Sequence, residues 1–273
     1  MTLQNYSTKP LVTVVLSTHD GDVQLAERAV KSVMAQDLPH QELQLLIAYD
    51  GKPAVDLGGL DRLVAKADFP VEMIYALEKT GYYTVPRNLA MSAIQGFYVA
   101  NLDADNEWTS EHLRGLLTAI RTHQDADGWP HFVYSRRKYV DERLATPGRP
   151  QVKLPVGPSP LVEWTPEHVS MLLRAPKWNF IDTSDFLIGR SALYELAELT
   201  GFVWNSDCRR FGDHELICRM AQRGFRGRAV DQVTHIYNWT GANLQLTRPL
   251  SQIEMIPQRA FEMLKSKGLW REN

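Results

Sequence analysis

The chain has 273 residues, of which 44% are hydrophobic and 23% are charged, as expected for an ordinary soluble globular protein. Its 30 basic residues are balanced by 32 acidic ones, so the net charge of −2 gives no reason to expect nucleic-acid binding. The two cysteines, Cys208 and Cys218, exclude a disulfide framework. Since the N-terminus lacks a signal-peptide pattern and no apolar run approaches the roughly 18 residues of a membrane span, we expect a cytoplasmic protein.

The first half of the chain alternates buried strands with amphipathic helices. Strands are predicted at 11–16, 43–49, 71–77 and 97–102, where aliphatic, aromatic and β-branched residues dominate. Helices are predicted at about 23–34, 60–67 and 86–95, and a fourth after residue 110 is expected to be capped by Thr109 or Ser110. This alternation predicts a parallel sheet with helices on both faces. The carboxyl ends of its strands meet at one edge, where open α/β sheets bind ligands.

The second half is less regular. We predict strands at 132–140, 185–189 and 227–237, and helices at 191–199, 211–224 and 252–264. Between residues 147 and 162, five prolines argue against any regular element. This segment is therefore predicted to be a long loop and a candidate lid.

The strand that ends at Leu102 leads directly into Asp103-Ala104-Asp105. Two carboxylates at the end of a buried strand suit a hard divalent cation, because Mg²⁺ and Mn²⁺ prefer oxygen ligands. A continuing strand would send the two side chains to opposite faces, so a shared site requires the chain to turn here. The alternative is a plain turn, since aspartate is also favoured in turns and at helix N-caps.

Four motifs in this order resemble the family 2 glycosyltransferases, which are inverting enzymes with the GT-A fold. They are Val14-Val15-Leu16-Ser17-Thr18, Asp50-Gly51, Pro86-Arg87-Asn88 followed by Leu102-Asp103-Ala104-Asp105, and Gly212-Asp213-His214-Glu215-Leu216. The resemblance implies an α/β, Rossmann-type, mostly parallel central sheet flanked by helices. It also implies one domain over residues 1–248 with abutting halves, in which about 1–105 bind the nucleotide sugar and 106–248 bind the acceptor. A helical tail over residues 249–273 follows.

The family further implies a nucleotide-diphosphate sugar as donor, with a UDP-sugar favoured, and an acceptor that is a saccharide or another hydroxyl-bearing molecule. The implied activity is inverting transfer of a hexosyl group. By position in the motifs, Ser17 and Thr18 would line the nucleoside pocket and Asp50 would bind the base. Arg87 would contact the diphosphate or the sugar, and Asp103 with Ala104 would complete the donor site.

The resemblance also implies a divalent metal, Mn²⁺ or Mg²⁺, held by Asp103 and Asp105, and it gives Asp213 the role of catalytic base. Glu215 is a rival for that role and Asp207 a remote one. In the family an acidic residue often precedes the base, whereas this chain has Gly212 there.

His235, on the last predicted strand, is a candidate additional metal ligand, although a half-buried structural histidine is the alternative. His19 and His214 are expected in a loop and on a helix surface. Four tryptophans of the second half are interpreted as core residues rather than an acceptor groove: Trp164, Trp178, Trp204 and Trp239.

Two other functions stay open. A sugar-phosphate nucleotidyltransferase has a similar fold but needs a glycine-rich loop with a basic residue after the first strand, and residues 17–22 contain only Gly21 and no lysine or arginine. A non-catalytic carbohydrate-binding protein on the same fold is the alternative from another class. We expect no nucleic-acid partner and no transmembrane segment, and the oligomeric state is left open.

Overall fold

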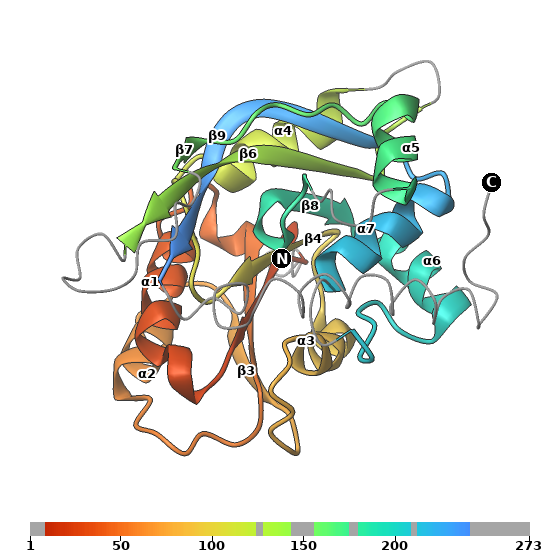
Figure 1. The fold of residues 1–273 in the computed structure, drawn as a ribbon. Helices are drawn as coiled ribbons and strands as arrows, with labels where there is room; N and C mark the ends of the chain where they lie inside the picture. Colours follow the sequence, from red (N-terminus) through yellow and green to blue (C-terminus); the bar gives the residue numbers. More distant parts are fainter. Residues whose placement is uncertain (1–8, 124–127, 143–155, 175–179, 209–211, 241–273) are drawn as a thin grey trace, which may run out of the picture.

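The computed structural model describes residues 9–123, 128–142, 156–174, 180–208 and 212–240 (Figure 1). In the first half the elements are β1 (Val12–Thr18), α1 (Val23–Met34), β2 (Leu43–Tyr49), α2 (Gly58–Val64), β3 (Val71–Tyr75), α3 (Thr84–Ala90), β4 (Tyr98–Asp103), β5 (Glu107–Trp108) and α4 (His112–Thr122). In the second half they are β6 (Phe132–Asp141), β7 (Gly157–Pro158), α5 (Pro166–Arg174), the 3-10 helix η5 (Thr183–Asp185), β8 (Phe186–Gly189), α6 (Arg190–Thr200), α7 (Gly212–Gln222) and β9 (Gly227–Trp239).

One sheet runs through the protein in the order β3-β2-β1-β4-β8-β6-β9-β5, with β7 paired to β6. Strands β3, β2, β1 and β4 are parallel, which confirms the prediction for the first half of the chain. Strand β8 is antiparallel to both β4 and β6, whereas β6 and β9 pair in parallel along their length. The fold is therefore a mixed α/β fold whose parallel half carries the predicted strand ends.

Helices cover both faces of the sheet, as the alternation predicts. Along β1, Val12, Val14 and Leu16 pack into one core and Val15 packs into the other. Helices α1 and α4 contribute to the first core, and α6 and α7 contribute to the second. Figure 1 shows α1 and α2 on one side of the sheet and α3, α6 and α7 on the other. Every residue of β1 and β2 is buried, as expected for strands that are covered on both faces.

A close backbone approach sets the start of β4. A Cβ atom at Gly96 would lie 2.4 Å from the backbone nitrogen of Thr13, so only glycine lets the chain pass here. The Gly96 amide also donates a hydrogen bond of 2.8 Å to the Thr13 hydroxyl. Strand β4 thereby enters the sheet directly beside β1, in a register that pairs Asp103 with Ser17.

Several local predictions need correction. Helix α4 begins at His112 with Glu111 at the N-cap and no side-chain capping bond, so the predicted caps Thr109 and Ser110 are wrong. The proline-rich segment does contain a short strand, β7, because Gly157 and Pro158 pair with the edge of β6. Helix α5 was not predicted. Strand β5 was not predicted either, because a two-residue strand has no periodicity to detect.

Most of the predicted lid and the predicted helix at 252–264 lie outside the described residues. The domain limits stay a prediction. No helix in the described part of the chain is long and apolar enough to cross a membrane.

Candidate functional site

The predicted donor residues lie at one edge of the parallel half of the sheet. Ser17 is in register with Asp103 on β4, and Thr18 is in register with Tyr49 at the end of β2. Ser17, Thr18 and Asp50 are all buried, with less than a tenth of each exposed. The carboxyl ends of three neighbouring strands thus bring together residues far apart in the sequence, as parallel packing requires.

Asp50 holds the loop that leads into α3. Its carboxylate accepts hydrogen bonds from the Thr80 amide at 2.9 Å, the Thr80 hydroxyl at 2.7 Å and the Gly81 amide at 2.6 Å. Asp50 thus stabilises this turn by accepting hydrogen bonds from it, which is a common role of aspartate. The predicted contact between Asp50 and a nucleobase stays a prediction.

Arg87 is a fully buried cation with unused donors. One Nη nitrogen forms an ion pair with Asp103, and the guanidinium lies 4.3 Å from the ring centre of Tyr83 and 4.7 Å from that of Trp204. Its Nε and Nη1 have no hydrogen-bond partner among the described residues. A buried guanidinium with free donors favours an anionic ligand, because each unsatisfied donor costs desolvation energy that an anion would recover.

Four carboxylates from three segments influence one another at this edge: Asp22, Asp103, Asp105 and Asp182. Burial raises the pKa of Asp105 well above its ordinary value, and the charges of Asp103, Asp22 and Asp182 raise it further. Burial also raises the pKa of Asp103, although the Arg87 guanidinium opposes that rise. The chain turns after β4, where the Asn106 amide donates to the Asp103 carbonyl at 3.0 Å, so both aspartates of the motif lie in one acidic region, as the metal-site interpretation requires.

A divalent cation fits the chemistry of this acidic region, because it would relieve the repulsion that raises these pKa values. Among the described residues, however, no three His, Cys, Asp or Glu side chains are gathered into a metal-binding cluster. Asp103, Asp105 and His235 together therefore stay a predicted ligand set. Two carboxylates completed by diphosphate oxygens and water are a usual environment for magnesium.

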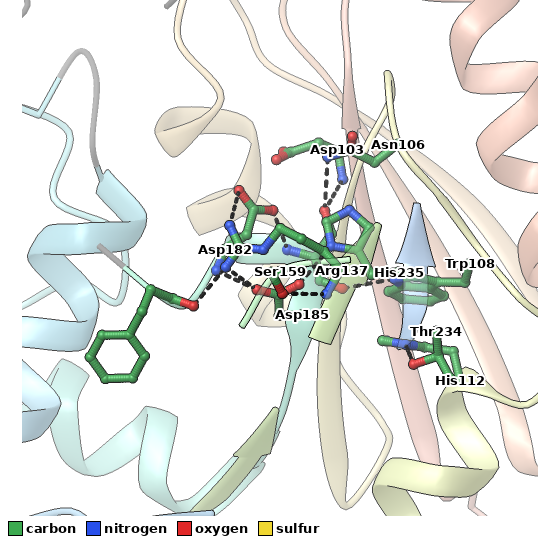
Figure 2. A network of polar contacts seen from close by, with 12 residues as sticks. Asp103, Asn106, Trp108, His112, Arg137, Ser159, Asp182, Asp185, Thr234 and His235 are labelled. Atoms are coloured by element: carbon green, nitrogen blue, oxygen red, sulfur yellow. Dashed lines mark hydrogen bonds and ion pairs between the residues drawn. The ribbon is translucent and has the colours of Figure 1, made fainter. Parts of the chain in front are cut away.

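His235 is completely buried and is not the half-buried histidine of the alternative interpretation. Its Nδ1 lies 2.6 Å from Oδ1 of Asp185, and its Nε2 has no hydrogen-bond partner among the described residues. The other carboxylate oxygen of Asp185 contacts Arg137 at 2.5 Å (Figure 2). A histidine that uses one nitrogen on a carboxylate and keeps the other free has the arrangement found in metal-ligating histidines.

Asp182 is the site residue that sequence reasoning missed. It begins η5 as the N-cap of a capping box with Asp185, and Figure 2 shows it on the opposite side of Arg137 from His235. Its charge raises the pKa of Asp103, Asp105 and Asp213. The pattern Asp182-x-x-Asp185 before an apolar strand is a capping signal, but only the fold shows that it faces the acidic region.

Asp213 lies in the first turn of α7. Burial raises its pKa to about 7, with Asp182 and then Asp103 adding to the rise. The rival Glu215 is occupied, because both of its oxygens accept hydrogen bonds from Arg219, at 2.7 and 2.9 Å. The remote rival Asp207 lies on the surface.

Two expectations about other side chains in this half have different outcomes. His214 is buried, so the expectation that it lies on the helix surface is wrong, because α7 is covered on more than one side. Trp204 and Trp239 are buried, which confirms their core interpretation, and Trp164 packs against Phe132 and Phe180. Trp178 lies outside the described residues.

The chain matches the family described as "Glycosyl transferase family 2" over residues 13–195. TuaG of Bacillus subtilis (strain 168), named for teichuronic acid biosynthesis, is 32% identical over 109 residues, which cover 40% of this chain and 41% of TuaG.

Two solved structures show the same fold. The S. aureus TarS fragment 1-349 in complex with UDP-GlcNAc is 14% identical with a TM-score of 0.64, over 87% of this chain and 61% of that one. The Pyrobaculum calidifontis mannosyltransferase PcManGT in complex with GDP-Man and Mn²⁺ is 16% identical with a TM-score of 0.56, over 87% of this chain and 59% of that one. The chain thus spans less than two thirds of the length of each of these three proteins.

Proposed function

Because the chain belongs to glycosyl transferase family 2, we propose that it transfers a sugar from a nucleoside-diphosphate sugar to an acceptor hydroxyl, with inversion at the anomeric carbon. The observation that carries this proposal is a pair of contacts made by Tyr83. Its ring lies 4.3 Å from the Arg87 guanidinium, and its hydroxyl accepts a hydrogen bond of 2.9 Å from the amide of Gly212, the residue before Asp213. The charges of Asp103 and Arg87 accordingly act on the Asp213 carboxyl. A base and a donor site within electrostatic reach of each other are what a one-step displacement needs.

Asp213 is the proposed base. Its pKa of about 7 lets the carboxylate accept a proton near neutrality while remaining ionised in a large fraction of the molecules. The acceptor oxygen attacks the anomeric carbon and its proton passes to Asp213. The bond between that carbon and the phosphate oxygen breaks, and its electron pair leaves with the nucleoside diphosphate. Attack from the face opposite the leaving group inverts the configuration.

Arg87 is the proposed contact for the diphosphate. The guanidinium is held by Asp103 on one side and by the rings of Tyr83 and Trp204. Its free Nε and Nη1, judged against the described residues, are donors suited to phosphate oxygens. Such a preorganised cation stabilises the charge that develops on the leaving group.

Asp103 and Asp105 would hold a Mn²⁺ or Mg²⁺ ion, with His235 as a further candidate ligand. When bound, such an ion acts as a Lewis acid toward the departing diphosphate. The raised pKa values of both aspartates support a cation here, and PcManGT was solved with Mn²⁺. A UDP-sugar is the favoured donor, supported by the TarS complex with UDP-GlcNAc, although PcManGT holds GDP-Man.

Isothermal titration with UDP, GDP, TDP and CDP, each with and without Mn²⁺, tests the proposal. We expect at least one nucleotide to bind about tenfold more tightly with the metal, a gain of about 1.4 kcal/mol. Asp105→Asn should remove that gain, whereas Asp231→Asn, a change at a largely exposed ion pair, should keep it. If none of the four nucleotides binds in a metal-dependent way, the proposal is wrong.

A further inference from the structure

Tyr83 touches both the donor side and the base side of the site. It occupies the N-cap position of α3, and its ring lies 4.3 Å from the Arg87 guanidinium, four residues along. The hydroxyl of the same side chain accepts a hydrogen bond of 2.9 Å from the backbone amide of Gly212. Gly212 begins α7 and directly precedes Asp213. One side chain therefore joins the cation proposed for the diphosphate to the helix that carries the proposed base.

The hydroxyl of Tyr83 also leaves little room for a side chain at residue 212. A Cβ atom at this position would lie 3.0 Å from the Tyr83 hydroxyl oxygen and 3.1 Å from the Thr84 methyl carbon. An acidic side chain, common at this position in the family, begins with the same Cβ, so both groups would have to shift by a few tenths of an ångström. The glycine at position 212, where the family often has an acidic residue, therefore fits closely against the Tyr83 hydroxyl.

Asn88 makes the aromatic support of Arg87 rigid. Its side-chain amide donates to the Trp204 carbonyl at 2.6 Å, and its carbonyl accepts from the Trp204 amide at 2.8 Å. The Trp204 ring meets the Tyr83 ring edge-on, with centroids 6.2 Å apart. The backbone at Trp204 is thereby tied to α3, so Tyr83 is held between a fixed ring and the first residue of α7.

We propose that Tyr83 is a positioning residue, which fixes the first turn of α7 and therefore the Asp213 carboxylate relative to Arg87. The inference rests on the proposed function and deepens it. Burial raises the pKa of Tyr83 well above its usual range, and the nearby charges of Asp213, which raises it, and Arg87, which lowers it, are consistent with a place between the two. A misplacement of about 1 Å between reacting groups can cost about a hundredfold in rate.

Tyr83→Phe is the direct test, because it keeps the ring over Arg87 and removes only the hydroxyl. We expect kcat to fall at least about tenfold while the Kd for the nucleotide changes less than about twofold. In the same variant, NMR-detected hydrogen exchange of the Gly212 amide should become at least about tenfold faster, because its acceptor is gone.

Tyr134→Phe is the matched control. Tyr134 is a buried tyrosine whose hydroxyl donates to the Val162 carbonyl at 2.6 Å, so this variant loses a tyrosine–backbone hydrogen bond elsewhere. It should leave kcat and the Gly212 exchange rate within about twofold of wild type. If Tyr83→Phe also keeps both values within about twofold, the positioning role is refuted.

A second variant separates packing from positioning. Gly212→Ala places a Cβ against the Tyr83 hydroxyl, so it should slow turnover in the wild-type background and slow it less when combined with Tyr83→Phe. If Gly212→Ala slowed turnover by the same factor with and without Tyr83→Phe, the contact between the two residues would be contradicted. If the wild-type protein transfers sugar from none of the donors, the proposed function has failed, and exchange at Gly212 still decides whether Tyr83 fixes α7.

Discussion

Two buried arginine–carboxylate pairs of this protein are built in different ways. On α7, Arg219 binds both oxygens of Glu215 with two nitrogens, at 2.7 and 2.9 Å, and donates to the Val203 carbonyl as well. Between α3 and β4, Arg87 contacts a single oxygen of Asp103. It leaves two nitrogens without a partner among the described residues, against one in Arg219. We call the Arg219–Glu215 pair closed, because both carboxylate oxygens are bonded to its own arginine. The Arg87–Asp103 pair instead keeps donors for a ligand.

The difference extends to the surroundings of each pair. Asp103 shares its region with Asp22, Asp105 and Asp182, and burial with mutual repulsion raises the pKa of Asp105 well above its usual range. A native structure tolerates such repulsion where a ligand will relieve it, and sites of this kind are often less stable than they could be. We therefore expect changes at the Glu215 pair to cost stability and changes in the acidic region to cost activity.

The largest expected effect follows from removal of the proposed base. Asp213→Asn should lower kcat by about 10²- to 10⁴-fold, because the acceptor hydroxyl loses its proton acceptor. The Kd for the nucleotide, measured by titration calorimetry, should stay unchanged. Asp207→Asn, at the exposed rival position, is the control and should keep its turnover. If Asp213→Asn kept turnover while Glu215→Gln lost it, the assignment of the two roles would have to be reversed.

Breaking the closed pair should cost stability instead. Glu215→Ala leaves the Arg219 guanidinium, only 3% exposed, without its carboxylate, and the free energy of unfolding should fall by about 3–5 kcal/mol. Urea denaturation measures this change. Glu195→Ala, which removes an exposed partner of Arg223, should cost only about 0–1 kcal/mol. Similar losses of unfolding free energy in the two variants would show that the buried Arg219–Glu215 pair contributes no more than an exposed pair does.

The pH dependence of kcat/KM sharpens the comparison further. The pKa of Asp213 is raised to about 7, and only the ionised carboxylate can accept a proton. The rate should therefore rise with pH up to about 7 and level off above it, so at pH 6 it should be about tenfold below the plateau. A profile of log kcat/KM from pH 5 to 9 tests this expectation, because kcat/KM reports the pKa of the free enzyme. A profile that is flat between pH 5 and 7 would rule out Asp213 as the titrating base.

The smallest expected effect is a gain in stability. The raised pKa of Asp105 means that the folded state binds a proton more tightly than the unfolded chain does. This carboxyl therefore destabilises the fold increasingly as pH rises above the unfolded-state value. Asp105→Asn should remove that penalty and add about 0.5–2 kcal/mol to the free energy of unfolding at pH 7. In Asp231→Asn, the exposed control, stability should stay nearly constant, and a loss of stability in Asp105→Asn would contradict the repulsion.

The fold could be predicted over most of its elements because burial leaves a periodic trace in the sequence. Strand β2 was predicted at its observed limits, and α6 and α7 were predicted to within about two residues of theirs. The short strand β5 was missed because it exists only through pairing with β9, more than a hundred residues away. The start of α4 was misplaced because two good capping residues precede a helix whose N-cap makes no side-chain bond.

The sequence alone determined which residue types stand at the strand ends, because local patterns of apolar and acidic residues record the alternation of buried strand and exposed turn. It also carried the family motifs around Asp103, Asp105 and Asp213. Only the tertiary structure decided that Asp182 joins the acidic region, that Glu215 is occupied by Arg219, and that Tyr83 reaches Gly212. These relations depend on contacts across the sheet and between helices, and the free energy of such contacts is set by burial and distance, which no short stretch of sequence contains.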